Sequence, residues 1–129
     1  MLNMTKGRLK QNGVHLEDHE YKTIKFFLER GENVELIPPI QIKGMSTPDI
    51  QIDGVVWEIK SPTGDGKHTM KHAVSNAKHQ STSIIIDLRR CKMSDDKAVN
   101  EVLHHFNLSK RLRRLKIIKK NEELLDFSK

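Results

Sequence analysis

An Asp-Gly pair at residues 53 and 54 restricts the fold of this chain more than any other feature of its sequence. The two central positions of a tight hairpin loop need a positive φ, which Gly and Asp tolerate, so the pair predicts a β-hairpin. A two-residue loop also fixes the register of its strands. The expected cross-strand pairs are Ile52 with Val55, Gln51 with Val56, Ile50 with Trp57, and Asp49 with Glu58.

Side chains alternate between the two faces of a strand, so this hairpin should have one apolar face and one polar face. The apolar face, which should pack on the core, holds Ile50, Ile52, Val55, Trp57 and Ile59. The polar face holds Asp49, Gln51, Glu58 and Lys60, with Val56 among them. This polar face is the candidate site, although half-solvated hairpins often carry such residues without any function.

Two carboxylates directly opposite each other on the polar face repel each other, which destabilises the hairpin by up to ~1 kcal/mol. A divalent cation between Asp49 and Glu58 would offset that repulsion, because Mg2+ takes oxygen ligands and is often held by one or two carboxylates. Lys60 points the same way as Glu58 and can hold a water molecule or meet a phosphoryl oxygen. The pattern favours metal-assisted hydrolysis of a phosphodiester.

A helix predicted from Val14 to Arg30 carries a third acidic residue among apolar ones. Its apolar stripe consists of Leu16, Ile24, Phe27 and Leu28. At about 100° per residue, Glu20 falls in the middle of that stripe, where a carboxylate costs free energy unless it is paired or bound to a cation. Glu20 is therefore either a third acidic ligand or a group that meets a buried partner or reaches solvent at the helix start.

Hydrophobic periodicity along the rest of the chain predicts an α/β fold. Residues 1–13 should form a loose or helical lead-in, and residues 121–129 an edge strand or tail. The elements predicted between them are strands at 33–37, 83–90 and 115–119, helices at 69–80 and 94–108, and a loop or loose strand extension at 40–46. The expected architecture is a single domain with its core at residues 14–120. A mixed central sheet of four to six strands, flanked by helices on both sides, would contain a parallel crossover after the hairpin.

Length and composition indicate one soluble globular domain. Of the 129 residues, 36% are hydrophobic, and no apolar run approaches the ~20 residues that cross a bilayer. The first residues lack the apolar region of a signal peptide, so the protein is expected to act in the cytoplasm without a membrane. Cys91 is the single cysteine, which excludes a disulfide framework and a cysteine-based zinc site. The net charge of +6 favours a polyanionic partner such as nucleic acid.

The combination of these features resembles the PD-(D/E)xK nuclease superfamily, in which a helix-borne acid precedes a PD pair and an ExK triplet. Here those motifs are Pro48-Asp49 and Glu58-Ile59-Lys60. The segments VELIPP, TPDIQIDGVVWEIKSPTG and IIIDLRR are more narrowly similar to the C-terminal tRNA-nuclease toxin domains of contact-dependent growth inhibition proteins. Related domains lie at the ends of some phage structural proteins. The resemblance covers about His19 to Arg90 and implies a restriction-endonuclease-like core.

The resemblance implies a role for each matching residue. Asp49 and Glu58 would be metal ligands, Lys60 would position or activate the attacking water, and Glu20 would complete the site as an acidic ligand. One or two Mg2+ or Mn2+ ions are the implied cofactors. The implied substrate contacts follow the hairpin, at Ser61, Asn76, Lys78 and Gln80. A cognate immunity protein is an implied partner.

Three functions remain open on the sequence. The first is an RNA endonuclease that cleaves tRNA, and the second is a DNA endonuclease of the same superfamily, because the metal site recognises a phosphodiester and not a sugar. The third is a basic nucleic-acid-binding domain without catalysis, whose binding would not depend on a metal. The oligomeric state, the metal stoichiometry and the cleaved position have no signal in the sequence.

Overall fold

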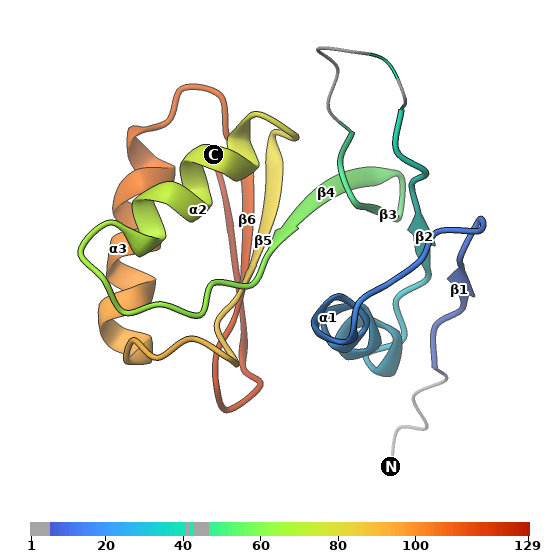
Figure 1. The fold of residues 1–129 in the computed structure, drawn as a ribbon, viewed down its shortest axis with the longest axis horizontal. Helices are drawn as coiled ribbons and strands as arrows, with labels where there is room; N and C mark the ends of the chain where they lie inside the picture. The colour runs from blue at the N-terminus through green and yellow to red at the C-terminus, as the bar shows by residue number, and fades with distance from the viewer. Residues whose placement is uncertain (1–5, 41, 43–46) are drawn as a thin grey trace. The chain divides into compact units, whose positions relative to one another are not determined.

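The structure is a computed structural model that describes residues 6–40, 42 and 47–129. The chain forms two compact units, Met1–Trp57 and Glu58–Lys129. Three helices are described, α1 (Asp18–Glu29), α2 (Thr69–Lys78) and α3 (Asp95–Leu108) (Figure 1). The described strands are β1 (Leu9–Lys10), β2 (Val34–Leu36), β3 (Ile50–Ile52), β4 (Val55–Lys60), β5 (Ser83–Asp87), β6 (Arg114–Ile118) and β7 (Leu124–Ser128).

Hydrogen bonds order the described strands as β1-β2-β3-β4-β5-β6-β7. The sheet is mixed, because β4, β5 and β6 are parallel whereas β3 and β7 are antiparallel to their neighbours. The α/β class is confirmed. The predicted count of four to six strands is wrong, because seven strands are described.

The hairpin in the first unit has the predicted register. Asp53 and Gly54 both have positive φ angles, of 50° and 81°, as a tight turn of this type needs. The three recorded pairs are Ile50 with Trp57, Gln51 with Val56, and Ile52 with Val55. On the apolar face Ile50, Ile52 and Trp57 are buried, whereas Val55 and Ile59 are half-buried.

Helix α1 begins at Asp18, four residues later than predicted, and ends at Glu29 just before Gly31. Gly31 has a φ of 87°, a conformation that favours Gly at a helix end. The buried side of the helix consists of Thr23, Ile24, Phe26 and Phe27. Leu16 lies before the helix and is half-buried, so the predicted apolar stripe is shorter than expected.

The predicted loose or helical lead-in is wrong for Leu9–Lys10, which form strand β1 parallel to β2. The preceding residue, Arg8, donates its N–H to Asn33 Oδ1 at 2.8 Å, and its carbonyl accepts the Val34 N–H at 2.9 Å. This two-residue strand is held by partners that are distant in the sequence. Arg8 and Asn33, for example, are 25 residues apart. Local periodicity carries no signal for such a strand. Residues 1–5, 41 and 43–46 lie outside the described part of the chain, and with them most of the predicted extension at 40–46.

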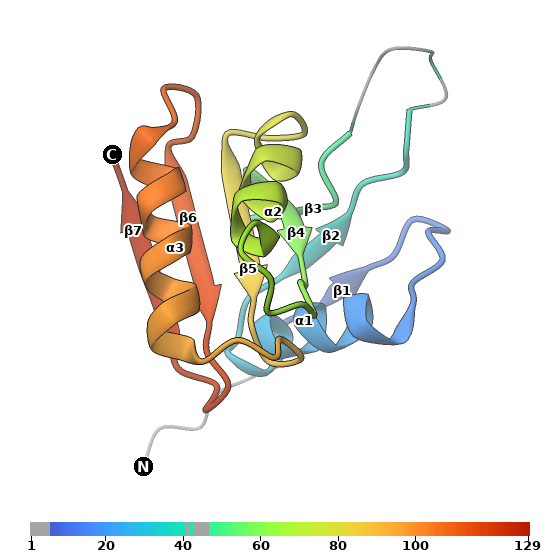
Figure 2. The ribbon, with the colours of Figure 1, turned by 60° about the vertical axis from the view of Figure 1, so that its left-hand side comes forward.

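The second unit has a core between two helices and a sheet. Helices α2 and α3 lie side by side over β5 and β6 (Figure 2). The predicted parallel crossover is confirmed, because β4 and β5, which flank α2, are paired in parallel. Every residue of β5 is buried, as its apolar run predicts, and Leu124–Ser128 form an edge strand on β6. The core side chains are Met70, Val74, Ala77, Ile84, Ile86, Leu88, Cys91, Met93, Ala98, Val102, Phe106, Leu112, Leu115 and Ile117.

Two basic side chains cover the carboxyl ends of the helices in this unit. Arg111 Nε donates to the Lys78 carbonyl at 2.5 Å, and Lys129 Nζ donates to the Phe106 and Ser109 carbonyls at 2.5 and 2.6 Å. The last carbonyls of a helix have no partner within the helix, and a cation there also balances the helix dipole. No helix in the described residues combines the length and apolarity needed to cross a membrane.

Candidate active site

Glu58 and Lys60 occupy alternate positions of β4 and therefore point to the same face of the sheet. Glu58 pairs with Ile84 and Lys60 with Ile86, so this face is the one that carries the core beneath α2 and α3. The Lys60 Nζ lies 3.3 Å from Glu58 Oε2. The Glu58 side chain is only 7% exposed, whereas the Lys60 side chain is 32% exposed. A buried carboxylate thus lies against an ammonium group that solvent can reach.

Asp49 lies in the first unit, directly before β3, and is half-buried. Its N–H donates to the Trp57 carbonyl at 3.0 Å, and its own carbonyl accepts the Ile37 N–H at 3.0 Å. The backbone of Asp49 is therefore held from two sides, and one of its partners is the residue that precedes Glu58. The recorded strand pairs end at Ile50 and Trp57, so the opposition of Asp49 and Glu58 stays a prediction.

Glu20 lies in the first turn of α1, not in the middle of an apolar stripe, because the helix begins at Asp18. Its Oε1 accepts the N–H of Glu17, the residue that caps the helix, at 3.1 Å. Glu20 thus has a backbone partner at an exposed helix start and not the buried partner considered from the sequence, and its role as a third acidic ligand stays a prediction. The potential ligand atoms of Glu17, His19 and Glu20 lie within 4.8 Å of one another, and His19 Nδ1 is 3.6 Å from Glu17 Oε2. Contacts of this kind are common at helix starts and need no metal.

The segment after Lys60 is tied to the segment after β5. The Ser61 carbonyl accepts a bond from Arg90 Nε at 3.0 Å, and the Thr63 carbonyl accepts the Lys92 N–H at 3.2 Å. Ser61 Oγ is buried and has no hydrogen-bond partner among the described residues. Both segments follow the carboxyl ends of neighbouring parallel strands, the edge where open α/β sheets commonly bind ligands. The sequence offered no signal for Arg90 or Lys92 beyond their charge.

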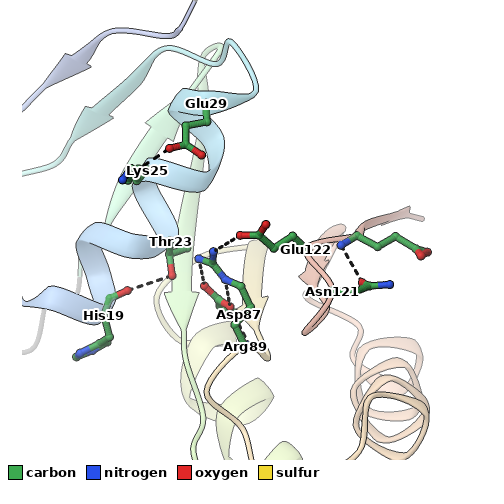
Figure 3. A network of polar contacts seen from close by, with 9 residues as sticks. His19, Thr23, Lys25, Glu29, Asp87, Arg89, Asn121 and Glu122 are labelled. Atoms are coloured by element: carbon green, nitrogen blue, oxygen red, sulfur yellow. Dashed lines mark hydrogen bonds and ion pairs between the residues drawn. The ribbon is translucent and has the colours of Figure 1, made fainter.

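A second buried carboxylate ends β5. Asp87 is 4% exposed and binds Arg89 through both oxygens, with Nη2 at 2.9 Å and Nε at 3.1 Å (Figure 3). Arg89 Nη1 also contacts Glu122 at 3.4 Å, and the hydrogen bond with Asp87 raises the pKa of the guanidinium. Asp87 points to the opposite face of β5 from Ile86 and is held by its own arginine. We interpret this group as a structural link between β5 and the β6–β7 turn.

The predicted contacts on and after α2 point in different directions. A helix turns by about 100° per residue, so Lys78 at the end of α2 is turned by roughly 160° away from Asn76. Lys78 lines a groove that α2 forms with α3. Asn76 is exposed, and Gln80, which lies beyond the end of the helix, is half-buried. Lys78 therefore does not share a helix face with Asn76, and Gln80 belongs to the turn that follows the helix.

Comparisons with known proteins place the fold. Residues 46–124, more than half of the chain, match the family described as the contact-dependent growth inhibition CdiA C-terminal domain. A solved structure described as a CdiA-CT/CdiI toxin and immunity complex from Burkholderia pseudomallei has a similar fold, with a TM-score of 0.72. The match covers 95% of this chain and 100% of that one at 15% sequence identity, which shows similarity of fold alone. No curated protein sequence matches the chain.

Proposed function

Because this chain belongs to the contact-dependent growth inhibition CdiA C-terminal domain family, we propose that it is a toxin module that cleaves RNA as a metal-dependent endonuclease. The proposed substrate is tRNA. The observation that carries this proposal is the pair at the end of β4, where buried Glu58 lies 3.3 Å from Lys60. A PD-(D/E)xK nuclease needs a carboxylate and a lysine at these two positions.

The donor set suits a hard divalent cation. Asp49 and Glu58 would hold one or two Mg2+ or Mn2+ ions through carboxylate oxygens, which such ions prefer. When bound, the metal would polarise the scissile phosphate and lower the pKa of a bound water. The backbone bond from Asp49 to Trp57 supports this assignment, because it links Asp49 to the peptide that leads into Glu58.

The remaining proposed residues act around that pair. Lys60 would orient the attacking water and stabilise negative charge on the phosphoryl group, while Glu58 keeps its ammonium in place. Glu20 is proposed as the third acid in addition to its contact with the Glu17 N–H. Ser61, Asn76, Lys78 and Gln80 are the proposed substrate contacts.

Cleavage assays with tRNA and duplex DNA, run in Mg2+ and then in EDTA, test the proposal. We expect cleavage of tRNA that EDTA abolishes, and strong loss of cleavage in Asp49→Asn, Glu58→Gln and Lys60→Ala. Asp53→Asn is the matched control, because Asn-Gly also forms this hairpin turn while one carboxylate is lost. Turnover that survives in two of the three site variants would defeat the assignment.

The same assays separate the alternatives. Metal-dependent cleavage of duplex DNA without cleavage of tRNA would make the chain a DNA endonuclease. Binding that is unchanged by EDTA, with no cleavage of either substrate, would make it a nucleic-acid-binding domain. The similar solved structure is a complex of a toxin with its immunity protein, so we also propose a cognate immunity protein as a partner.

A further inference from the structure

The second unit contains a groove between α2 and α3, with a volume of about 210 Å3. Its polar lining consists of Lys71, Ser75 and Lys78 from α2, His105 from α3, and Ser109 directly after α3. Val74 forms part of the floor and is buried, whereas Leu108 at the rim is 67% exposed. Among the described residues that line the groove, none is acidic.

The spacing of the groove residues makes an extended cationic edge. Lys71, Ser75 and Lys78 lie at positions i, i+4 and i+7 of one helix, so they project to the same side. At a rise of 1.5 Å per residue, the two lysines are roughly 10 Å apart along the helix axis. His105 faces them from the neighbouring helix. A chain of phosphate groups can meet such an edge at more than one point, whereas a single small anion cannot.

Basic side chains neutralise the carboxyl ends of the helices near the groove. A helix carries partial negative charge at its carboxyl end, which would repel phosphate close to Lys78 and Leu108. Arg111 covers the Lys78 carbonyl and Lys129 covers the Phe106 and Ser109 carbonyls, so a cation balances each of these ends.

The surroundings of the His105 imidazole lower its pKa. Burial lowers its pKa, and the charges of His104 and Lys71 lower it further, while Glu101 opposes the change. Lys78 also faces the groove. A bound phosphate would favour the protonated imidazole, so the groove can gain a further positive charge when an anion enters it.

We infer that the α2–α3 groove binds the sugar-phosphate backbone of a nucleic acid, through Lys71, Lys78 and His105. This inference rests on the proposed nuclease function and adds a second contact in the second unit besides Glu58 and Lys60. Leu108 gives the rim an apolar surface that a ribose or a base can cover. The absence of acidic groups from the described lining favours a polyanion over a neutral ligand.

Binding of tRNA to the full chain in EDTA, where no cleavage is expected, tests the groove. The double variant Lys71→Ala/Lys78→Ala should weaken binding by about 10-fold or more and reduce the slope of log K against log salt by roughly 1 to 2. The control Lys25→Ala/Lys97→Ala removes the same charge from exposed helix positions outside the groove. An affinity and a salt slope equal to those of the control would overturn the inference.

A second readout uses His105. Wild-type binding should tighten between about pH 8 and about pH 6, and His105→Gln should tighten less, because it lacks the titrating imidazole. The same pH dependence in both proteins would contradict a role for His105.

Failure of the inference is distinguishable from failure of the proposed function. If the wild type cleaves tRNA in Mg2+ while the groove variant binds like the control, the groove inference fails alone. If the wild type neither binds nor cleaves any nucleic acid, the proposed function fails and the inference fails with it. If the groove variant binds tRNA normally but binds an immunity protein weakly, the groove is a protein interface and the inference is overturned.

Discussion

Glu20 in the first unit and Glu58 in the second are both carboxylates that the sequence places beside apolar residues, and the fold holds them in different ways. Glu20 is half-buried and accepts a backbone N–H within three residues of its own position. Glu58 is almost fully buried within a strand, next to β5, and contacts Lys60. A carboxylate at a helix start stabilises the fold locally, whereas one buried in a strand requires a cation beside it.

The two units also differ in how much structure surrounds these groups. The described strands β1, β2 and β3 of the first unit have two or three residues each, and those confined to the second unit have five. Two helices cover the core of the second unit. The surroundings of Glu58 are therefore held in place by the sheet and two helices. We expect replacement of its charge to change the cleavage rate more than the stability of the fold.

The largest effect should follow from Glu58→Gln, which keeps the shape of the side chain and removes its charge. We expect cleavage to fall by at least about 10³-fold, because a proposed metal ligand and the partner of Lys60 are lost together. Thermal unfolding should change little, because the Lys60 ammonium that loses its partner is 32% exposed and can be hydrated. Rates from single-turnover assays, beside the Asp53→Asn control, measure this. If the folded fraction of Glu58→Gln fell as much as its cleavage rate, the contrast between Glu58 and Glu20 would disappear.

Arg89→Met should affect stability and not chemistry. It removes the guanidinium that binds both oxygens of buried Asp87, so we expect the free energy of unfolding to fall by about 3 kcal/mol. Denaturant titration measures the loss, and the cleavage rate of the folded protein should stay within a few-fold of the wild type. A strong loss of cleavage in folded Arg89→Met would instead place Asp87 in the active site.

Glu20→Gln separates the two interpretations of the first-unit carboxylate. Gln can accept the same Glu17 N–H, so the helix start and the melting temperature should be preserved. If Glu20 is also a ligand, cleavage should fall by roughly 10- to 100-fold. An unchanged rate would assign Glu20 to the helix start alone and leave Asp49, Glu58 and Lys60 as the proposed site.

The smallest effect concerns His105, whose pKa is lowered from its ordinary value of 6.5. As the pH falls, the unfolded chain takes up this proton before the folded chain does, so acid favours unfolding. The stability that this group contributes is present above about pH 6.5 and is lost as the pH falls through the lowered pKa. In His105→Gln, this pH-dependent contribution to the free energy of unfolding should be absent. Equal pH dependence of unfolding in both proteins would contradict the direction of the shift.

Much of the fold follows from local patterns. The Asp53-Gly54 turn predicts the three recorded strand pairs, and the continuous apolar run at β5 predicts a strand buried on both faces. Strand β1 was not predictable in the same way, because its pairing with β2 depends on partners distant in sequence. The start of α1 was misplaced because Leu16 continues the helical spacing although it lies before the first turn.

The candidate site was predictable in part. Alternation along β4 correctly places Glu58 and Lys60 on one face, since that face depends only on strand geometry. The partner of Glu20 was not predictable without the helix start. The bonds from Arg90 and Lys92 to the segment after Lys60 join parts of the chain that only the parallel pairing of β4 and β5 brings together.

Cys91 gives the segment beside Lys60 a natural reporter. Cys91 is 4% exposed and its thiol donates to the Gly64 carbonyl at 3.2 Å, so an alkylating reagent can reach the sulfur only when this segment separates from the one after β5. The rate of Cys91 alkylation would therefore measure how often the two segments separate. A bound oligonucleotide that contacts both segments should lower the rate of Cys91 alkylation.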